Sequence, residues 1–135
     1  MKLKGRTVNP GKAEGEAIVT RTPFSFLGEI DPATGKVPSP NHELYGQSLV
    51  DKIFVCPTGK GSSAGPGVGY VAKLNNNLPK AMIIGEIEPI LAAAILTADI
   101  PAMDQLEKNP LDVIETGDYV IVDADQGFVE VIKKS

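Results

Sequence analysis

The sequence has few of the residues that usually bind metals or cofactors. Its 135 residues include one cysteine, one histidine and no tryptophan, and aromatic residues make up only 5%. A lone cysteine forms no internal disulfide and does not hold an iron–sulfur cluster, which takes several thiolate ligands. A zinc site also needs more than one histidine and one cysteine. We therefore expect no metal and no cofactor within this chain.

The sequence also lacks a basic stretch and a long apolar run. The formal net charge is -4 and the pI is near 5.0, whereas nucleic-acid binding depends on clustered lysine and arginine. The longest apolar run, residues 89–96, is far shorter than the roughly 20 residues of a membrane-spanning helix. The first 15 residues contain no apolar core of a signal peptide. These features predict a cytoplasmic protein with no nucleic-acid or membrane partner.

The composition is otherwise that of an ordinary globular protein, with 42% apolar and 22% charged residues. No repeat, low-complexity segment or linker divides the chain. A chain of this length is large enough to bury a core. We expect one domain over residues 1–135.

Strand and helix patterns alternate in the middle of the chain. Strands are predicted at 2–8, 15–20, 52–56, 80–85, 100–103, 118–123 and 128–132, and helices from about 66 to 74 and from 89 to 96. The second helix is apolar on every side, so we expect it to be buried all round. The order of elements predicts an α/β fold: a β/β/α layered domain with a mixed sheet, flanking helices and antiparallel strands at both ends.

A glycine-rich loop, PTGKGSSAGPG at residues 57–67, joins the strand at 52–56 to the first helix. Backbone amides at such a helix start favour the binding of an oxyanion. The glycine spacing fits neither the phosphate loop of nucleotide hydrolases nor the dinucleotide fingerprint. Two interpretations of Ser62 and Ser63 stay open: they cap the helix, with Ser63 as the N-cap, or one becomes a nucleophile or base once its alkoxide is stabilised.

Three features outside this loop also carry expectations. His42 lies among prolines and is expected to face solvent; a phosphoryl carrier that uses this histidine is the alternative function. Cys56 lies in an apolar strand and is expected to be a buried structural thiol. Three large apolar side chains within residues 23–28 are expected to be exposed and to contact a partner chain; they are Phe24, Phe26 and Leu27.

Five motifs, in the same order along the chain, resemble the small subunit of the aconitase X family. They are residues 15–17 (GEA), 22–28 (TPFSFLG), 30–35 (IDPATG), 42–49 (HELYGQSL) and 59–63 (GKGSS). The resemblance covers nearly the whole chain. It implies a stand-alone form of the swivelling β/β/α domain of aconitases.

The resemblance also implies an activity that this chain does not possess alone. Family members pair the small chain with a large catalytic subunit that carries a [4Fe-4S] cluster and most of the substrate site. Such pairs are hydro-lyases. Archaeal members remove water from 5-phosphomevalonate, a phosphorylated small molecule of the mevalonate pathway, to give trans-anhydromevalonate 5-phosphate. Related bacterial proteins dehydrate cis-3-hydroxy-L-proline, which is the alternative substrate.

The resemblance assigns roles within the GSS motif. Ser62 falls on the family's catalytic serine, the proton-accepting base, while Gly61, Ser63 and Ala64 are expected to hold substrate oxygens or stabilise the alkoxide. One position departs from ordinary aconitases, in which a substrate-binding arginine follows the two serines. Ala64 stands there in this chain, so a cation for the substrate must come from the partner or from Lys60, whose role stays open.

Overall fold

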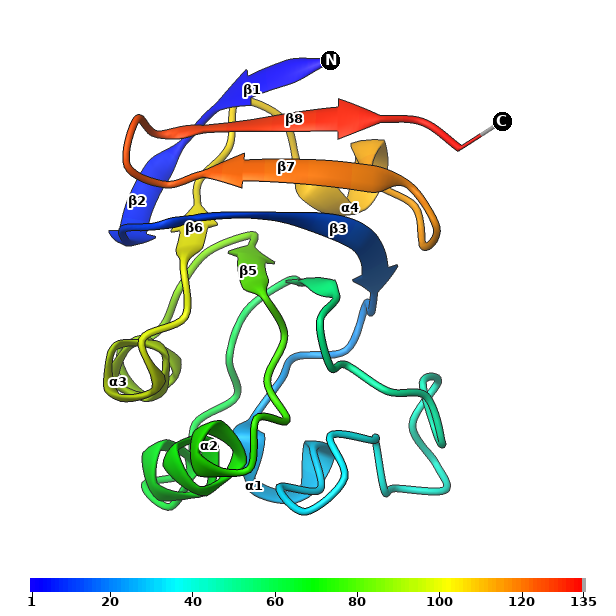
Figure 1. The fold of residues 1–135 in the computed structure, drawn as a ribbon, viewed down its shortest axis with the longest axis vertical. Coiled ribbons are helices and arrows are strands. Elements are labelled where there is room, and N and C mark those ends of the chain that lie inside the picture. Colours follow the sequence, from blue (N-terminus) through cyan, green and yellow to red (C-terminus); the bar gives the residue numbers. More distant parts are fainter. Residues whose placement is uncertain (135) are drawn as a thin grey trace.

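The computed structural model describes residues 1–134, which fold into three layers (Figure 1). Figure 1 shows β1, β8 and β7 at the top, α1, α2 and α3 at the bottom, and the remaining strands between them, while the short helix α4 lies at the level of the upper strands. In chain order the elements are β1 (Lys2–Lys4), β2 (Arg6–Asn9), β3 (Lys12–Val19), α1 (Phe26–Glu29), β4 (Ile53–Cys56), α2 (Gly65–Leu74), β5 (Ala81–Ile84), α3 (Pro89–Ala98), β6 (Ala102–Asp104), α4 (Pro110–Val113), β7 (Tyr119–Asp123) and β8 (Phe128–Ile132).

The strands form one mixed sheet in the order β1-β8-β7-β3-β4-β5-β6-β2. The long strand β3 joins its two halves: residues 12–16 pair antiparallel with β7, and residues 17–19 pair parallel with β4. Only Gly5 separates β1 from β2, although these strands stand at opposite ends of the order. The sheet therefore folds over on itself, and its two halves become the two β layers.

The parallel strands β4 and β5 are buried on both faces, as expected of strands covered on both sides. Ile53 and Val55 point into the core between the two β layers, while Phe54 and Cys56 point into the core between the sheet and the helices. The four-residue apolar run thus contributes to both cores. The end of β4 is held rigidly, and the glycine-rich loop begins at that point.

The predicted α/β fold is confirmed, including the central β4–α2–β5–α3–β6 order and the β7–β8 hairpin. Two predictions are wrong in detail. The strand expected at residues 2–8 is divided at Gly5 into β1 and β2, which pair with different strands. Helix α3 is not buried all round: it lies in the outer layer, and Leu96 on its outer face is 57% exposed.

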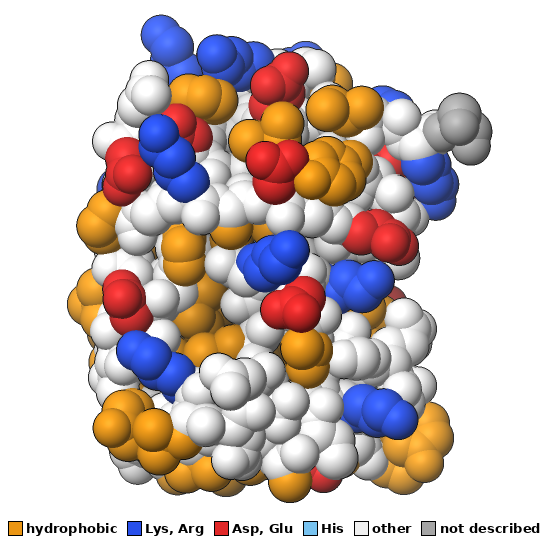
Figure 2. Space-filling view, viewed as in Figure 1, with side chains coloured by type: hydrophobic (Ala, Val, Ile, Leu, Met, Phe, Trp, Pro, Cys, Tyr) orange, Lys and Arg blue, Asp and Glu red, His pale blue; other side chains and the backbone are white. Residues whose placement is uncertain are grey.

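Charged side chains of both signs are interspersed on the face shown in Figure 2, without a basic stripe. Within the part of the chain that the structure describes, no helix is long and apolar enough to cross a membrane.

Candidate functional site

The loop that follows β4 is held against the segment that follows β3. The amide of Phe24 donates to the carbonyl of Thr58 at 2.9 Å, and the amide of Lys60 donates to the carbonyl of Phe24 at 3.2 Å. These two bonds extend a strand-like pairing, Phe24 with Gly59, beyond the end of the sheet. They fix the loop up to Lys60 and leave the next residues to turn away.

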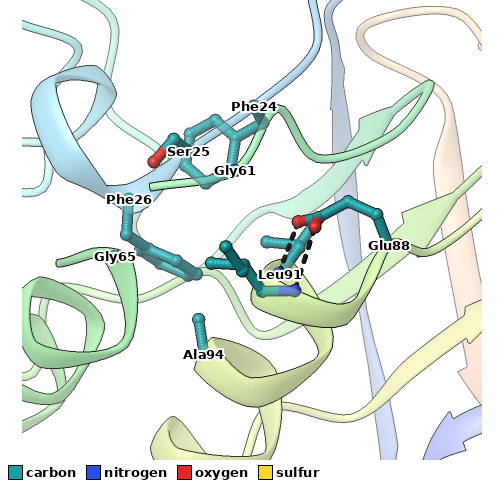
Figure 3. A pocket seen from close by; sticks show the side chains of 9 residues that line it. Phe24, Ser25, Phe26, Gly61, Gly65, Glu88, Leu91 and Ala94 are labelled. Carbon is teal, nitrogen blue, oxygen red and sulfur yellow. Dashed lines mark hydrogen bonds between the residues drawn. The ribbon is translucent and has the colours of Figure 1, made fainter. Parts of the chain in front are cut away.

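Gly59 is required by its neighbours. A Cβ atom at this position would lie 2.3 Å from Glu88 Oε1 and 2.7 Å from Leu91 Cβ, which is closer than real Cβ contacts allow. Figure 3 shows the narrow pocket beside this contact: Glu88, the N-cap of α3, and Leu91 on α3 lie on one side, and Gly61 of the loop and Gly65 of α2 lie on the other. The close approach brings the loop and the start of α3 together without a side chain between them.

The backbone of the loop is strained at the serine. Gly61 has φ 83° and Ser62 has φ 101°, a region that residues with a side chain rarely adopt and that costs roughly 1–3 kcal/mol. Glycine would avoid this cost, yet the position holds serine. Strained residues of this kind concentrate at functional sites.

The four predicted site residues are consecutive, and none of their amides has a partner among residues 1–134. Among residues 1–134, the amides of Gly61, Ser62, Ser63 and Ala64 donate no hydrogen bond, whereas the amide of Gly65 donates to the carbonyl of Ser62 at 3.0 Å. Ser62 is half-buried, and Ser63 and Ala64 are exposed. The loop therefore offers a row of amide donors beside a serine hydroxyl at the start of α2.

The expectation that Ser63 caps α2 is wrong. The N-cap residue is Ala64, which has no side-chain oxygen, and among the described residues no side-chain capping hydrogen bond is made to this helix. Pro66 lies in that first turn, as predicted, where its missing amide costs nothing. Gly61 and Ser62 both take positive φ values, and the helix begins at Gly65, with Ala64 in the capping position where Ser63 was expected.

A buried ionisable cluster lies next to the loop. The carboxylate of Glu29, which is 6% exposed, accepts a hydrogen bond from the amide of Ser25 at 2.6 Å through Oε1. Its Oε2 lies 3.2 Å from Lys60 Nζ and 3.6 Å from His42 Nε2. Lys60 immediately precedes Gly61, so the cluster adjoins the serine loop. Sequence reasoning missed Glu29, because the two side chains that pair with it, His42 and Lys60, lie 13 and 31 residues away in the chain.

The expectation that His42 faces solvent is wrong, since its side chain is only 6% exposed. Its Nδ1 accepts a hydrogen bond from the amide of Leu44 at 3.0 Å, so in the neutral imidazole the proton is on Nε2. The proline-rich segment 37–47 is extended and turn-forming, as predicted. It nevertheless folds back to place this ring against α1.

The expected patch of exposed aromatic residues is also largely wrong. Phe24 and Phe26 are buried and pack edge-to-face, with ring centroids 5.2 Å apart, and Phe24 packs in the same way on Phe54. Leu27 alone of the three is exposed. The two rings fill the space between the sheet and α2, and Phe26 lies against Gly69, where a larger residue would crowd it.

No group of three or more histidine, cysteine, aspartate or glutamate side chains among residues 1–134 has the arrangement of a metal site. Cys56 is fully buried, as predicted, and burial raises the pKa of its thiol. A buried, protonated thiol that stands alone does not fit an iron–sulfur cluster.

The layered sheet and the serine loop between a parallel strand and a helix define a swivelling β/β/α domain. The chain belongs to the aconitase X family: residues 2–131 match the family model described as the aconitase X swivel domain.

Relatives of similar length support this assignment. The chain is 50% identical to the phosphomevalonate dehydratase small subunit of Thermococcus kodakarensis, over 98% of both chains. It is 44% identical to the protein of the same name in Methanosarcina mazei, over 99% of this chain and 93% of the relative. The crystal structure of Thermococcus kodakaraensis aconitase X in its holo-form is 48% identical and superimposes with a TM-score of 0.92, covering 98% of this chain and 99% of that one.

Proposed function

We propose that this chain is the small subunit of a two-chain hydro-lyase that dehydrates 5-phosphomevalonate to trans-anhydromevalonate 5-phosphate, and that the whole chain is one swivelling domain. The observation that carries the proposal is the full-length similarity to phosphomevalonate dehydratase small subunits, at 50% identity for Thermococcus kodakarensis. The comparison covers 98% of both chains, so the similarity is not confined to one motif.

We assign the role of base to Ser62. The reaction removes a proton from C2 of the substrate and the hydroxyl group from C3, which leaves a double bond between these carbons. A serine hydroxyl is a weak base unless its alkoxide is stabilised. The amides of Gly61 and Ala64, the Ser63 hydroxyl and the dipole of α2 are the groups placed to stabilise the alkoxide or to hold substrate oxygens.

The partner is inferred to be a large catalytic subunit. The single buried cysteine of this chain leaves no ligand set for a cluster, so we infer that the large subunit holds the [4Fe-4S] cluster, which would supply a Lewis acid for the leaving hydroxyl. The serine loop lies at the surface, where its half-buried and exposed residues can meet a second chain. We expect the assembled pair to be cytoplasmic.

The test is an assay of the reconstituted pair. The small chain is mixed with the large aconitase X chain from the same source, loaded with its cluster under anaerobic conditions, and supplied with 5-phosphomevalonate or cis-3-hydroxy-L-proline. We expect turnover of 5-phosphomevalonate by the pair and none by either chain alone. A cluster-loaded pair that dehydrates only cis-3-hydroxy-L-proline would contradict the proposed substrate.

The burial of His42 argues against the alternative of a phosphoryl carrier. A carrier presents its histidine to a donor protein and to an acceptor protein in turn, whereas this ring is 6% exposed and its Nδ1 is bonded to the amide of Leu44.

A further inference from the structure

A second pocket adjoins the serine loop on the side of Lys60. It has a volume of about 310 Å³ and is formed by three segments: residues 22–29, residues 39–42 and Lys60. Its volume is at the lower end of the range for small-molecule sites. Thr22, Ser39 and Asn41 contribute hydroxyl and amide groups to its lining. The pocket thus carries many hydrogen-bond donors at one end of the proposed active site.

One residue that lines this pocket, His42, has a buried donor without an acceptor among residues 1–134. His42 Nε2 is buried and makes no hydrogen bond with any group among residues 1–134. Its distance of 3.6 Å from Glu29 Oε2 is too long for a hydrogen bond. Because Nδ1 already accepts from Leu44, Nε2 carries the proton and needs an acceptor. A buried N–H group without an acceptor is costly, and a ligand oxygen would remove that cost.

The pocket is lined by one cation and one carboxylate, which pair with each other. Lys60 Nζ is the cation, and its side chain is 49% exposed. Glu29, which is fixed by the Ser25 amide, is the acidic residue that lines the pocket and balances the lysine. Lysine binds phosphate as a point charge, and surrounding neutral donors add hydrogen bonds to the phosphate oxygens.

The separation from Ser62 matches the proposed substrate. The Cα atoms of Lys60 and Ser62 are two residues apart, so they lie at most about 7 Å from each other. In 5-phosphomevalonate the C2 atom that loses its proton and the phosphate-bearing C5 atom are three carbon–carbon bonds apart. A substrate with C2 at Ser62 therefore reaches the pocket with its phosphate.

We propose that this pocket is the subsite for the phosphate monoester of the substrate, with Lys60 Nζ and His42 Nε2–H as donors to its oxygens. This inference rests on the proposed function, because it takes 5-phosphomevalonate as the substrate. The subsite would distinguish a phosphorylated substrate from an unphosphorylated one on the small chain itself.

Two substitutions test the subsite in the reconstituted pair. Lys60→Met keeps the aliphatic stem and removes the charge. His42→Asn removes the Nε2 donor while the Asn side-chain oxygen can still accept from the amide two residues on, as Nδ1 does. Lys108→Met, at an exposed lysine in the loop after β6, is the matched control for loss of one surface charge.

We expect each of the two pocket variants to raise the KM for 5-phosphomevalonate at least about tenfold, the loss typical of one hydrogen bond to a charged group. The inhibition constant of inorganic phosphate, used as a competitive probe, should rise by a similar factor, with kcat changing much less. The control should match the wild type. Unchanged KM and unchanged phosphate inhibition in both variants would overturn the subsite, and so would a fall in kcat alone.

A second measurement separates this proposal from the function on which it rests. Inorganic phosphate is titrated into the isolated, isotope-labelled full chain, and the amide signals of Gly28 and Gly61 and the His42 ring signals are followed by NMR. We expect saturable shifts that Lys60→Met abolishes. If the wild-type pair is inactive with 5-phosphomevalonate but these shifts occur, the proposed function fails and the phosphate site stands; if no shifts occur, the phosphate site fails.

Discussion

The loops that follow β4 and β5 both lead from a buried parallel strand into a helix with proline in its first turn, but the two helix starts differ. At α3 the side chain of Glu88 accepts from the amides of Ile90 and Leu91, at 2.9 and 2.5 Å. At α2 no side chain caps the first turn, and Ser62 takes a strained backbone conformation. Helix α3 satisfies its own amides, whereas α2 leaves donors for a ligand.

The comparison shows how one fold divides stability and function between similar junctions. At the start of α3 the Glu88 carboxylate already accepts hydrogen bonds from the first-turn amides, so these amides are not free to bind a ligand and the junction contributes to packing. A helix start without a side-chain cap, such as that of α2, is less stable, but its free amides can bind an anion or stabilise an alkoxide. The two junctions are in contact at Gly59, where Glu88 and Leu91 of the β5–α3 junction pack against the backbone of the β4–α2 junction.

The largest effect is expected from the removal of the serine hydroxyl. Ser62→Ala should lower the turnover of the reconstituted pair by about three powers of ten, the contribution typical of a general base. Assembly with the large subunit should be unchanged, because the substitution removes a single oxygen atom from a half-buried side chain. Turnover and gel filtration of the pair measure both properties. Turnover close to that of the wild type would show that Ser62 is structural.

The next largest effect is expected on the free energy of unfolding, from a substitution at the contact between the two junctions. Gly59→Ala should lower the free energy of unfolding by about 2–3 kcal/mol, since the added methyl group would overlap Glu88 and Leu91. Gly67→Ala is the matched control: its Cβ would have open space, and alanine favours a helix by up to about 1 kcal/mol. Urea unfolding of both variants gives the comparison. Equal stability of the two would mean that the junctions move independently.

A smaller difference in stability is expected between the loss of the Glu88 cap at α3 and the loss of the Ser63 hydroxyl before α2. Glu88→Ala should cost about 1 kcal/mol of stability because it removes the acceptor for two helix amides. Ser63→Ala should change stability by no more than about 0.3 kcal/mol, since Ser63 caps nothing and is exposed. Thermal midpoints of the two variants, measured under the same conditions, test this. A larger loss from Ser63→Ala than from Glu88→Ala would reverse the assignment of the caps.

The smallest effect concerns the strain at Ser62. Ser62→Gly should be more stable than Ser62→Ala by roughly 0.5–1 kcal/mol, because glycine adopts φ 101° without a steric cost. Both variants lose the hydroxyl, so both should be equally inactive. This pair separates backbone strain from chemistry. Higher stability of the alanine variant would show that the positive φ does not persist in solution.

The sequence predicted the layers of the fold well because strand and helix periodicity is local. The apolar run that became β4, the helix after Pro66 and the β7–β8 hairpin each follow from neighbouring residues. Errors arose where long-range packing decided the outcome. The burial of Phe24 and Phe26 depends on Phe54 and α2, and the splitting at Gly5 depends on strands more than 90 residues away.

The sequence by itself determined the serine loop, its place between a strand and a helix, and the family motifs, because glycine content and apolar patterns act over a few residues. Only the tertiary structure decided the conformation of Ser62, the missing cap of α2 and the cluster of Glu29, His42 and Lys60. These three side chains come from segments 13 to 31 residues apart. Their proximity results from the packing of the segments on the sheet, which no local pattern encodes.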